Sequence, residues 1–343
     1  MKFKIKVLAI FFTLFTTISC SNIGVLAFDG EILTPNALKK GDKVCLLTMS
    51  RTTPSFRKIL YERLPAAINK LESLGFEVKV YEESFTASEL GDDTAQLRAN
   101  LFNKAVKNSE IKAIIAINGG VSAIQTLPYI NYEAFRENNK IFVGYSDPTI
   151  VMAAIFKKSG VITFHGPMPG ALYHLEENLC FDNLFDILMN PKAQTELINI
   201  DDNSKFEIFK EGNCDGRVIG GNLWEMQHIM GTPYELEFKD KILFFEEVNE
   251  EDPYRINHVL WQMKLGENLN KLKGIIIGTL TSKKGIEGEK ELLNAAFKAL
   301  DDVDIPIIYN FHVGHIPNPL TVPIGANLKI ENGKVFVMQP VVQ

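Results

Sequence analysis

The chain has 343 residues, 46% of them hydrophobic and 23% charged, with a formal net charge of −6. These proportions are typical of a soluble globular protein with one or two domains, and they exclude a disordered, fibrous or polytopic membrane protein. The sequence contains no run of basic residues. It therefore argues against nucleic acid as a partner, because nucleic-acid binding needs a concentrated positive surface.

Residues 1–27 have the layout of a secretory signal peptide. Three lysines precede an apolar run at 7–15, which is too short to span a membrane. Two processing sites remain open. Residues 17–20 resemble a relaxed lipobox, which would make Cys20 a lipid anchor, whereas residues 25–27 suit an ordinary signal peptidase. We expect an exported protein, either a membrane-anchored lipoprotein or a soluble protein of the periplasm or cell envelope.

Short apolar runs alternate with amphipathic stretches between residues 31 and 165. The apolar runs predict strands at 44–49, 77–81, 111–117, 141–143 and 161–164, and the amphipathic stretches predict helices at 55–74, 94–108, 123–130 and 149–158. This alternation is typical of an α/β fold with a doubly wound, largely parallel sheet. We therefore predict an N-terminal domain over residues 31–165.

The rest of the chain predicts a connecting segment and a second domain. Residues 166–205 contain many turn-forming residues and little periodicity, which predicts a connecting segment with some helix. From 206 to 343, strands predicted at 206–209, 217–219, 242–245, 274–278 and 335–342 alternate with helices, which indicates a smaller, mixed α/β domain. No metal-ligand spacing or phosphate-binding loop is present, so we expect neither a metal nor a cofactor.

Three strand ends followed by glycine-containing turns are candidate sites, because sites in open α/β sheets lie at the carboxyl ends of strands. The first contains Gly119 and Gly120, which suit either a nucleophile elbow with an oxyanion hole or a tight packing turn. The second ends in Glu246, which suits a carboxylate that orients a histidine or a solvated acidic turn. The third carries His315 after a glycine, and His165 at another strand end is a rival candidate.

Together these segments resemble the LD-carboxypeptidase family, the serine peptidases that include muramoyl-tetrapeptide carboxypeptidases and microcin C self-immunity proteins. The resemblance runs from residue 38 to residue 326 and rests on seven motifs in the family's order. They are Gly119-Gly120 with Leu127-Pro128-Tyr129-Ile130, residues 144–149, His165-Gly166-Pro167, residues 220–223, residues 231–234, the strand ending at Glu246, and Gly314-His315.

This resemblance implies a Ser-His-Glu triad that removes a terminal D-amino acid, typically D-Ala, from murein tetrapeptides. Glu246 would orient the imidazole and stabilise its charge, and His315 would act as general base and then general acid. The residues expected to line the oxyanion and substrate-binding site, or else to form structural turns, are Gly119, Gly120, Ser146, Asp147 and Asn222. The resemblance also implies a site between two domains, murein peptides as partners and a homodimer.

The sequence departs from the family at the nucleophile. The third residue after the paired glycines is Ala123, and the serine stands one residue earlier, at Ser122. Loss of a triad nucleophile typically costs about 10⁴–10⁶ in rate. A local shift of one Cα step, ~3.8 Å, would present Ser122 instead. Alternatively the chain binds murein peptides without cleaving them, uses another nucleophile or a water, or carries a deliberate alanine substitution. A hydrolase of another amide is a further possibility.

Overall fold

The computed structural model describes residues 30–88, 94–169, 179–197, 206–248 and 251–343. The predicted signal peptide and Cys20 lie outside these residues. Within the described ranges, no helix combines the length and the apolar character needed to cross a membrane.

The N-terminal half forms a six-stranded sheet in the order β12-β5-β4-β3-β1-β2. The strands are β1 (Lys43–Leu47), β2 (Glu77–Val80), β3 (Ile111–Ala116), β4 (Ile141–Gly144), β5 (Thr163–His165) and β12 (Val322–Ile324). The first five are parallel, and β12 pairs with β5 in the antiparallel direction. β1 and β3–β5 are buried over nearly their whole length, which explains their continuous apolar sequences.

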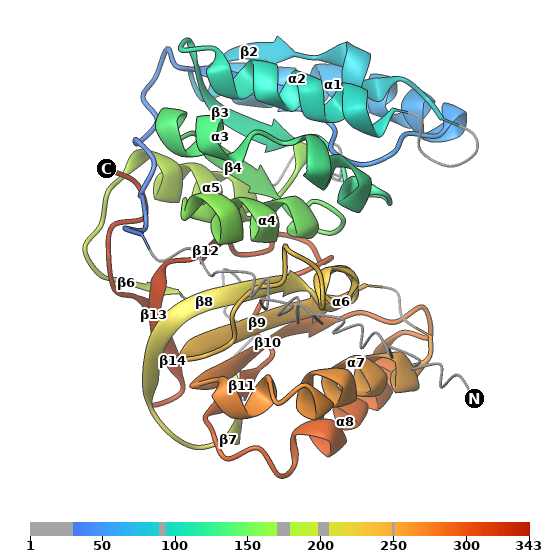
Figure 1. The fold of residues 1–343 in the computed structure, drawn as a ribbon, viewed down its shortest axis with the longest axis vertical. Coiled ribbons are helices and arrows are strands. Elements are labelled where there is room, and N and C mark those ends of the chain that lie inside the picture. Colours follow the sequence, from blue (N-terminus) through green and yellow to red (C-terminus); the bar gives the residue numbers. More distant parts are fainter. Residues whose placement is uncertain (1–29, 89–93, 170–178, 198–205, 249–250) are drawn as a thin grey trace, which may run out of the picture.

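Helices pack against this sheet (Figure 1). They are α1 (Pro54–Ser73), α2 (Ala95–Lys107), α3 (Tyr132–Asn138), α4 (Thr149–Ser159) and α5 (Leu179–Met189), with the 3₁₀ helices η1 (Glu82–Phe85) and η2 (Ala123–Tyr129). The start of α1 follows from its sequence, because the Thr53 side chain accepts a hydrogen bond from the Phe56 N–H and Pro54 occupies the first helical position.

The C-terminal half forms an eight-stranded mixed sheet in the order β6-β14-β13-β8-β9-β10-β11-β7. Its strands are β6 (Thr195–Leu197), β7 (Glu207–Lys210), β8 (Cys214–Asn222), β9 (Lys241–Glu247), β10 (Gly274–Leu280), β11 (Ile307–Tyr309), β13 (Asn327–Glu331) and β14 (Lys334–Val337). The central strands β8 to β11 are parallel. The helices of this half are α6 (Leu223–Ile229), η4 (Leu269–Lys271), α7 (Pro253–Leu265) and α8 (Ile286–Leu300).

The observed α/β architecture, with one largely parallel and one mixed sheet, confirms the predicted fold class. The predicted domain boundaries do not separate the two sheets cleanly, because β12 comes from the predicted C-terminal domain and pairs with β5 of the N-terminal sheet. The predicted connecting segment contains α5 and β6, and the predicted strand 335–342 ends at Val337. The helix predicted at 123–130 is a 3₁₀ helix with Pro128 inside it.

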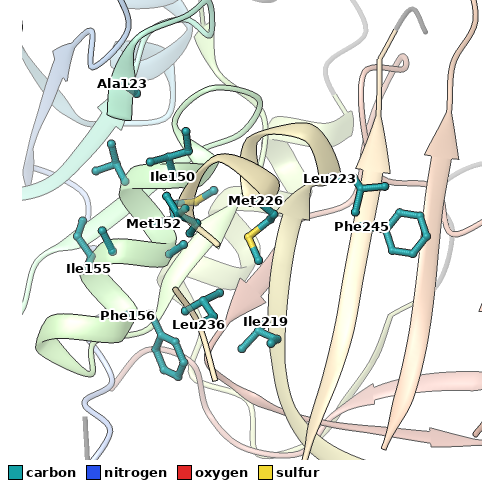
Figure 2. Close-up of a cluster of buried hydrophobic side chains, with 14 of the residues drawn as sticks. Ala123, Ile150, Met152, Ile155, Phe156, Ile219, Leu223, Met226, Leu236 and Phe245 are labelled. Carbon is teal, nitrogen blue, oxygen red and sulfur yellow. The ribbon is translucent and has the colours of Figure 1, made fainter. Parts of the chain in front are cut away.

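A continuous apolar core joins the two halves through α4. Every residue of α4 except Lys158 is buried, as expected for a helix covered by neighbours on all sides. In Figure 2, Ile150 and Met152 of α4 lie near Met226 of α6, and all three belong to one buried cluster. The junction also holds a polar contact, from the Asn222 N–H to Thr149 Oγ1 at 3.2 Å. These contacts bring the carboxyl ends of β8 and β9 toward the N-terminal sheet.

Candidate active site

The order of the N-terminal strands predicts where a ligand would bind. The parallel strands run β2-β1-β3-β4-β5, and in this arrangement ligands bind at the carboxyl ends of the strands where the order reverses, between β1 and β3. The segment after β1 meets the segment after β3 at this point, where the Arg51 N–H donates to the Val121 carbonyl at 2.8 Å. Residues 119–123, here called the elbow, follow β3 at the predicted place.

The elbow has a tightly constrained backbone. A Cβ atom on Gly119 would lie 2.9 Å from Ser146 Cβ, so only glycine fits against the loop after β4. Ser122 is left-handed, with φ 75° and ψ 12°, and its side chain does not cap the helix that follows. Ser122 is half-buried, whereas Ala123 is fully buried and begins η2. The left-handed residue of the elbow is therefore the serine.

The predicted carboxylate and imidazole meet in the structure. His315 Nδ1 lies 2.8 Å from Glu246 Oε2, with the Glu246 side chain fully buried and the His315 side chain 18% exposed. Glu246 lies near the end of β9, and His315 lies in the loop between β11 and β12. A Cβ atom on Gly314 would approach Glu246 Oε2 to 3.1 Å at a φ of +133°, so this glycine permits the close approach.

The pair stabilises opposite charges on its members. Burial lowers the pKa of His315, but the neighbouring Glu246 carboxylate outweighs burial, and the pKa is raised above its ordinary value. Burial alone would raise the pKa of Glu246, but the charge and hydrogen bond of His315 lower it below the ordinary value. With Glu246 ionised, Nδ1 of His315 donates to the carboxylate, which leaves Nε2 as the atom that can accept a proton.

Asn222 supports this pair from the adjacent strand, where it stands in register with Glu246. Its Nδ2 donates to Glu246 Oε1 and to Glu247 Oε1, both at 3.2 Å, and its Oδ1 accepts the Glu225 N–H at the start of α6. Asn222 is only 3% exposed. The structure thus places Asn222 behind Glu246, as a residue that orients the carboxylate.

Glu247 is a second buried carboxyl group at this strand end, and it was not predicted as a site residue from the sequence. Burial and the charge of Glu246 raise its pKa to about 7. Its Oε2 accepts the Trp224 N–H at 3.0 Å. Its position after an apolar strand was the only signal in the sequence, and the same signal describes most acidic turns.

Ser146 and Asp147 lie in the loop after β4, beside the elbow. Ser146 has a φ of 62°, and its side chain packs against Gly119. Asp147 is 1% exposed, and its Oδ2 and Oδ1 accept the Ala123 N–H at 3.0 and 3.2 Å. Burial, together with the charge of Glu225, raises the pKa of Asp147 to about 7. This carboxylate is therefore placed to hold the elbow backbone.

His165, the rival histidine, is 1% exposed. Burial lowers its pKa to about 4. Its ring packs between Phe244 and Tyr145, and the Tyr145 ring in turn lies 4.8 Å from that of His315. His165 is therefore a neutral, packed side chain at neutral pH. Tyr145, which sequence reasoning missed, is a direct neighbour of the half-buried His315 imidazole.

No group of three or more potential metal ligands (His, Cys, Asp or Glu) occurs in the part of the chain that the structure describes. The loop after β4 links the serine-bearing elbow to the Glu-His pair, because Ser146 packs against Gly119 and Tyr145 packs against His315. This arrangement is suited to proton transfer and nucleophilic attack on a carbonyl group.

Comparison with known proteins identifies the family of the chain. The LD-carboxypeptidase N-terminal domain model matches residues 50–166, and the LD-carboxypeptidase C-terminal domain model matches residues 215–330. The probable murein peptide carboxypeptidase of Bacillus subtilis (strain 168) is 30% identical over 305 residues, which cover 85% of this chain and 89% of that protein.

Solved structures extend the likeness to three dimensions. The wild-type microcin C7 self-immunity protein MccF without ligand matches with a TM-score of 0.80 at 25% identity, covering 91% of this chain and all of that one. An MccF-like protein from Bacillus anthracis str. Ames matches with a TM-score of 0.79 at 27% identity, covering 90% and 99%. MccF has also been solved in complex with aspartyl sulfamoyl adenosine. Because both domain models and most of the chain match, this protein belongs to the LD-carboxypeptidase family.

Proposed function

We propose that the chain is a serine hydrolase that removes a C-terminal D-amino acid from murein peptides, with Ser122 as the nucleophile. The observation that carries the proposal is the preformed pair of His315 and Glu246, 2.8 Å apart. Such a pair holds the imidazole in one orientation and stabilises the imidazolium that forms during acyl transfer. A protein that only binds peptides has no need of it.

The proposed reaction has two halves. His315 Nε2 takes the proton of Ser122 Oγ as that oxygen attacks the carbonyl carbon of the scissile amide. His315 then returns the proton to the amide nitrogen as the C–N bond breaks, which releases the D-amino acid and leaves an ester on Ser122. A water that loses its proton to His315 then attacks the ester carbonyl carbon. His315 returns that proton to Ser122 Oγ as the ester C–O bond breaks, which releases the shortened peptide and restores the serine. Glu246 stays ionised throughout and stabilises each imidazolium.

The oxyanion of the tetrahedral intermediate needs backbone donors on the elbow. The Ala123 N–H is already bonded to Asp147, so other N–H groups of this turn are required. Our candidate donor is the N–H group of Gly120, which is exposed and has a φ of +142°.

Murein peptides are the favoured substrate class because of the relatives. The B. subtilis protein that is 30% identical is named a probable murein peptide carboxypeptidase. MccF binds aspartyl sulfamoyl adenosine, so another aminoacyl compound is the alternative substrate. Export, as predicted from residues 1–27, would bring the chain to murein fragments of the cell envelope.

One observation favours a second function, the binding of murein peptides without cleavage. The motif spacing puts the family's nucleophile at Ala123, and this residue is fully buried at the start of η2. A methyl group at this position cannot attack, and the Glu-His pair would then only contact the bound peptide.

The experiment that tests the proposal is D-Ala release from murein tetrapeptide by the chain from residue 28 onward. Three proteins are compared: the unchanged chain, Ser122→Ala and Ala123→Ser. We expect the unchanged chain to release D-Ala. In Ser122→Ala the rate of release should fall by a factor of at least about 10³. A fluorophosphonate, which labels activated serines, should attach to Ser122 in the unchanged chain.

Two results would decide against this proposal. Release of D-Ala by Ala123→Ser alone, with tetrapeptide binding by the unchanged chain, would establish the binding function. Equal release by the unchanged chain and Ser122→Ala would exclude Ser122 as the nucleophile.

A further inference from the structure

A buried carboxylate holds the elbow from the side of β4. Asp147 is 1% exposed and follows β4, which pairs with β3, the strand that leads into the elbow. Both of its carboxylate oxygens lie within hydrogen-bond distance of one elbow atom, the Ala123 nitrogen. With so little exposed surface, the Asp147 side chain has no room to contact a peptide substrate.

Charged and polar groups from three other elements face this carboxylate. The Ser50 hydroxyl lies beside it in the segment after β1, Arg98 of α2 supplies a positive charge, and Glu225 of α6 supplies a negative charge. Arg98 is itself fully buried, and its Nε donates to the Met49 carbonyl at 3.0 Å. The carboxylate is thus held between the segment after β1, α2 and the second half of the molecule.

The conformation of Ser122 needs such a support. A left-handed backbone is unfavourable for a residue other than glycine and persists only where the surroundings determine it. The segments on both sides of Ser122 are fixed by hydrogen bonds, to Arg51 through the Val121 carbonyl and to Asp147 through the Ala123 N–H. Hydrogen bonds to an ionised acceptor are the stronger kind.

We propose that Asp147 is the positioning residue of the elbow: it acts through the Ala123 amide to hold Ser122 in its left-handed conformation and makes no contact with substrate. The consequence for catalysis rests on the proposed function. The hydrogen bond itself does not, so it can be tested without an activity.

The chain offers a selective probe for this bond. Ser122-Ala123 is the only Ser-Ala dipeptide in the sequence. Labelling serine with ¹³C at the carbonyl and alanine with ¹⁵N therefore gives a single carbonyl-correlated amide signal, that of Ala123. The shift of this amide proton should follow the ionisation of Asp147, with a midpoint near pH 7, because an ionised acceptor deshields its donor more than a neutral one.

Two variants complete the test. Asp147→Asn should remove the titration and speed hydrogen exchange of the Ala123 amide by about tenfold or more. Glu225→Gln keeps the hydrogen bond and removes a like charge, so it should keep the titration and move its midpoint to lower pH. An Ala123 amide signal in the unchanged chain that is insensitive to pH and exchanges with solvent as fast as an unprotected amide would overturn the proposal. This measurement uses the unchanged chain, so it tests the proposal even if Asp147→Asn does not fold.

The catalytic consequence has its own readout. In the unchanged chain, or in Ala123→Ser if only that variant is active, Asp147→Asn should lower kcat about tenfold or more with KM changed less than twofold, because the substrate-contacting groups are untouched. A rise in KM at constant kcat would instead make Asp147 a substrate-binding residue and overturn the proposal. Failure of Ser122 as the nucleophile would leave the Ala123 amide titration in place.

Discussion

Glu246 is fully buried, yet its pKa lies below the ordinary value because His315 and Asn222 both contact its carboxylate. The pKa of its half-buried partner, His315, depends on this charge in turn. If Glu246 were neutral, only burial and more distant charges would act on His315, and burial favours the uncharged imidazole. This buried carboxylate is therefore the main group that stabilises the imidazolium of His315.

Substitution of Glu246 by Gln should lower the pKa of His315 and reduce D-Ala release by about 10²–10⁴, because the amide keeps the shape but not the charge. The His315 titration can be followed by NMR of the imidazole Cε1–H signal. Glu247→Gln is the matched control, since Glu247 affects the pKa of His315 more weakly, and it should shift the midpoint less. Equal midpoints in Glu246→Gln and the unchanged chain would show that the pair does not stabilise the imidazolium.

Much of this site could be predicted from the strand ends and glycine turns together with the family resemblance. Glu246, His315 and the glycine turn were identified from the sequence, and the structure brings Glu246 and His315 together. The hydrogen bond from the Ala123 N–H to Asp147 was not predictable, because it depends on how the loop after β3 and the loop after β4 lie relative to each other. The neutral role of His165 was also not predictable, because it follows from complete burial of its ring.

At the scale of elements, the close pairing of β8 with β9 places Asn222 beside Glu246. This pairing requires glycine at position 220. A Cβ atom there would lie 1.7 Å from the Phe244 carbonyl oxygen of β9, and the backbone φ of +130° is itself unfavourable for other residues. The end of β8 is therefore shaped for backbone contact rather than side-chain packing.

Gly220→Ala should destabilise the fold by about 2–4 kcal/mol, from backbone strain and overpacking together. Urea unfolding measures the free energy of unfolding. Gly266→Ala is a suitable control, because its φ is not in the left-handed region and its nearest contact would be 3.4 Å, and it should change stability by less than about 1 kcal/mol. Similar free energies of unfolding for the two variants would mean that β8 can shift to accommodate the Cβ atom without loss of stability.

Elements with a long apolar or periodic segment were predicted well, such as α1, α2 and β3. The seven-residue helix α3 was missed, because two turns give too few residues to establish a period. The pairing of β12 with β5 joins residues more than 150 positions apart. No local pattern carries such a contact, which is why the predicted boundary at residue 206 does not divide the two sheets.

For the whole molecule, burial of two carboxyl groups on opposite sides of the junction links stability to pH. Asp147 in the N-terminal half and Glu247 in the C-terminal half both have their pKa raised to about 7 by burial, against ordinary values near 4. Between these values the folded chain keeps protons that the unfolded chain has lost. Stability from these groups therefore falls as pH rises from about 4 to 7.

The contribution of Glu247 can be isolated by Glu247→Gln, which cannot ionise. In urea unfolding from pH 4.5 to 7.5, the free energy of unfolding should fall less steeply with pH in this variant than in the unchanged chain. The two slopes should differ by up to about 1.4 kcal/mol per pH unit. Glu246 and His315 contribute the opposite signs, stability lost at low pH for Glu246 and at high pH for His315, but both are present in both proteins and largely cancel in the difference. Glu133→Gln on the exposed surface of α3 should leave the slope unchanged. Equal slopes for Glu247→Gln and the unchanged chain would mean that Glu247 is ionised in the folded protein at pH 5. Glu246 and Glu247 would then both carry a negative charge, and Glu247 would add to the larger effect of Glu246 in raising the pKa of His315.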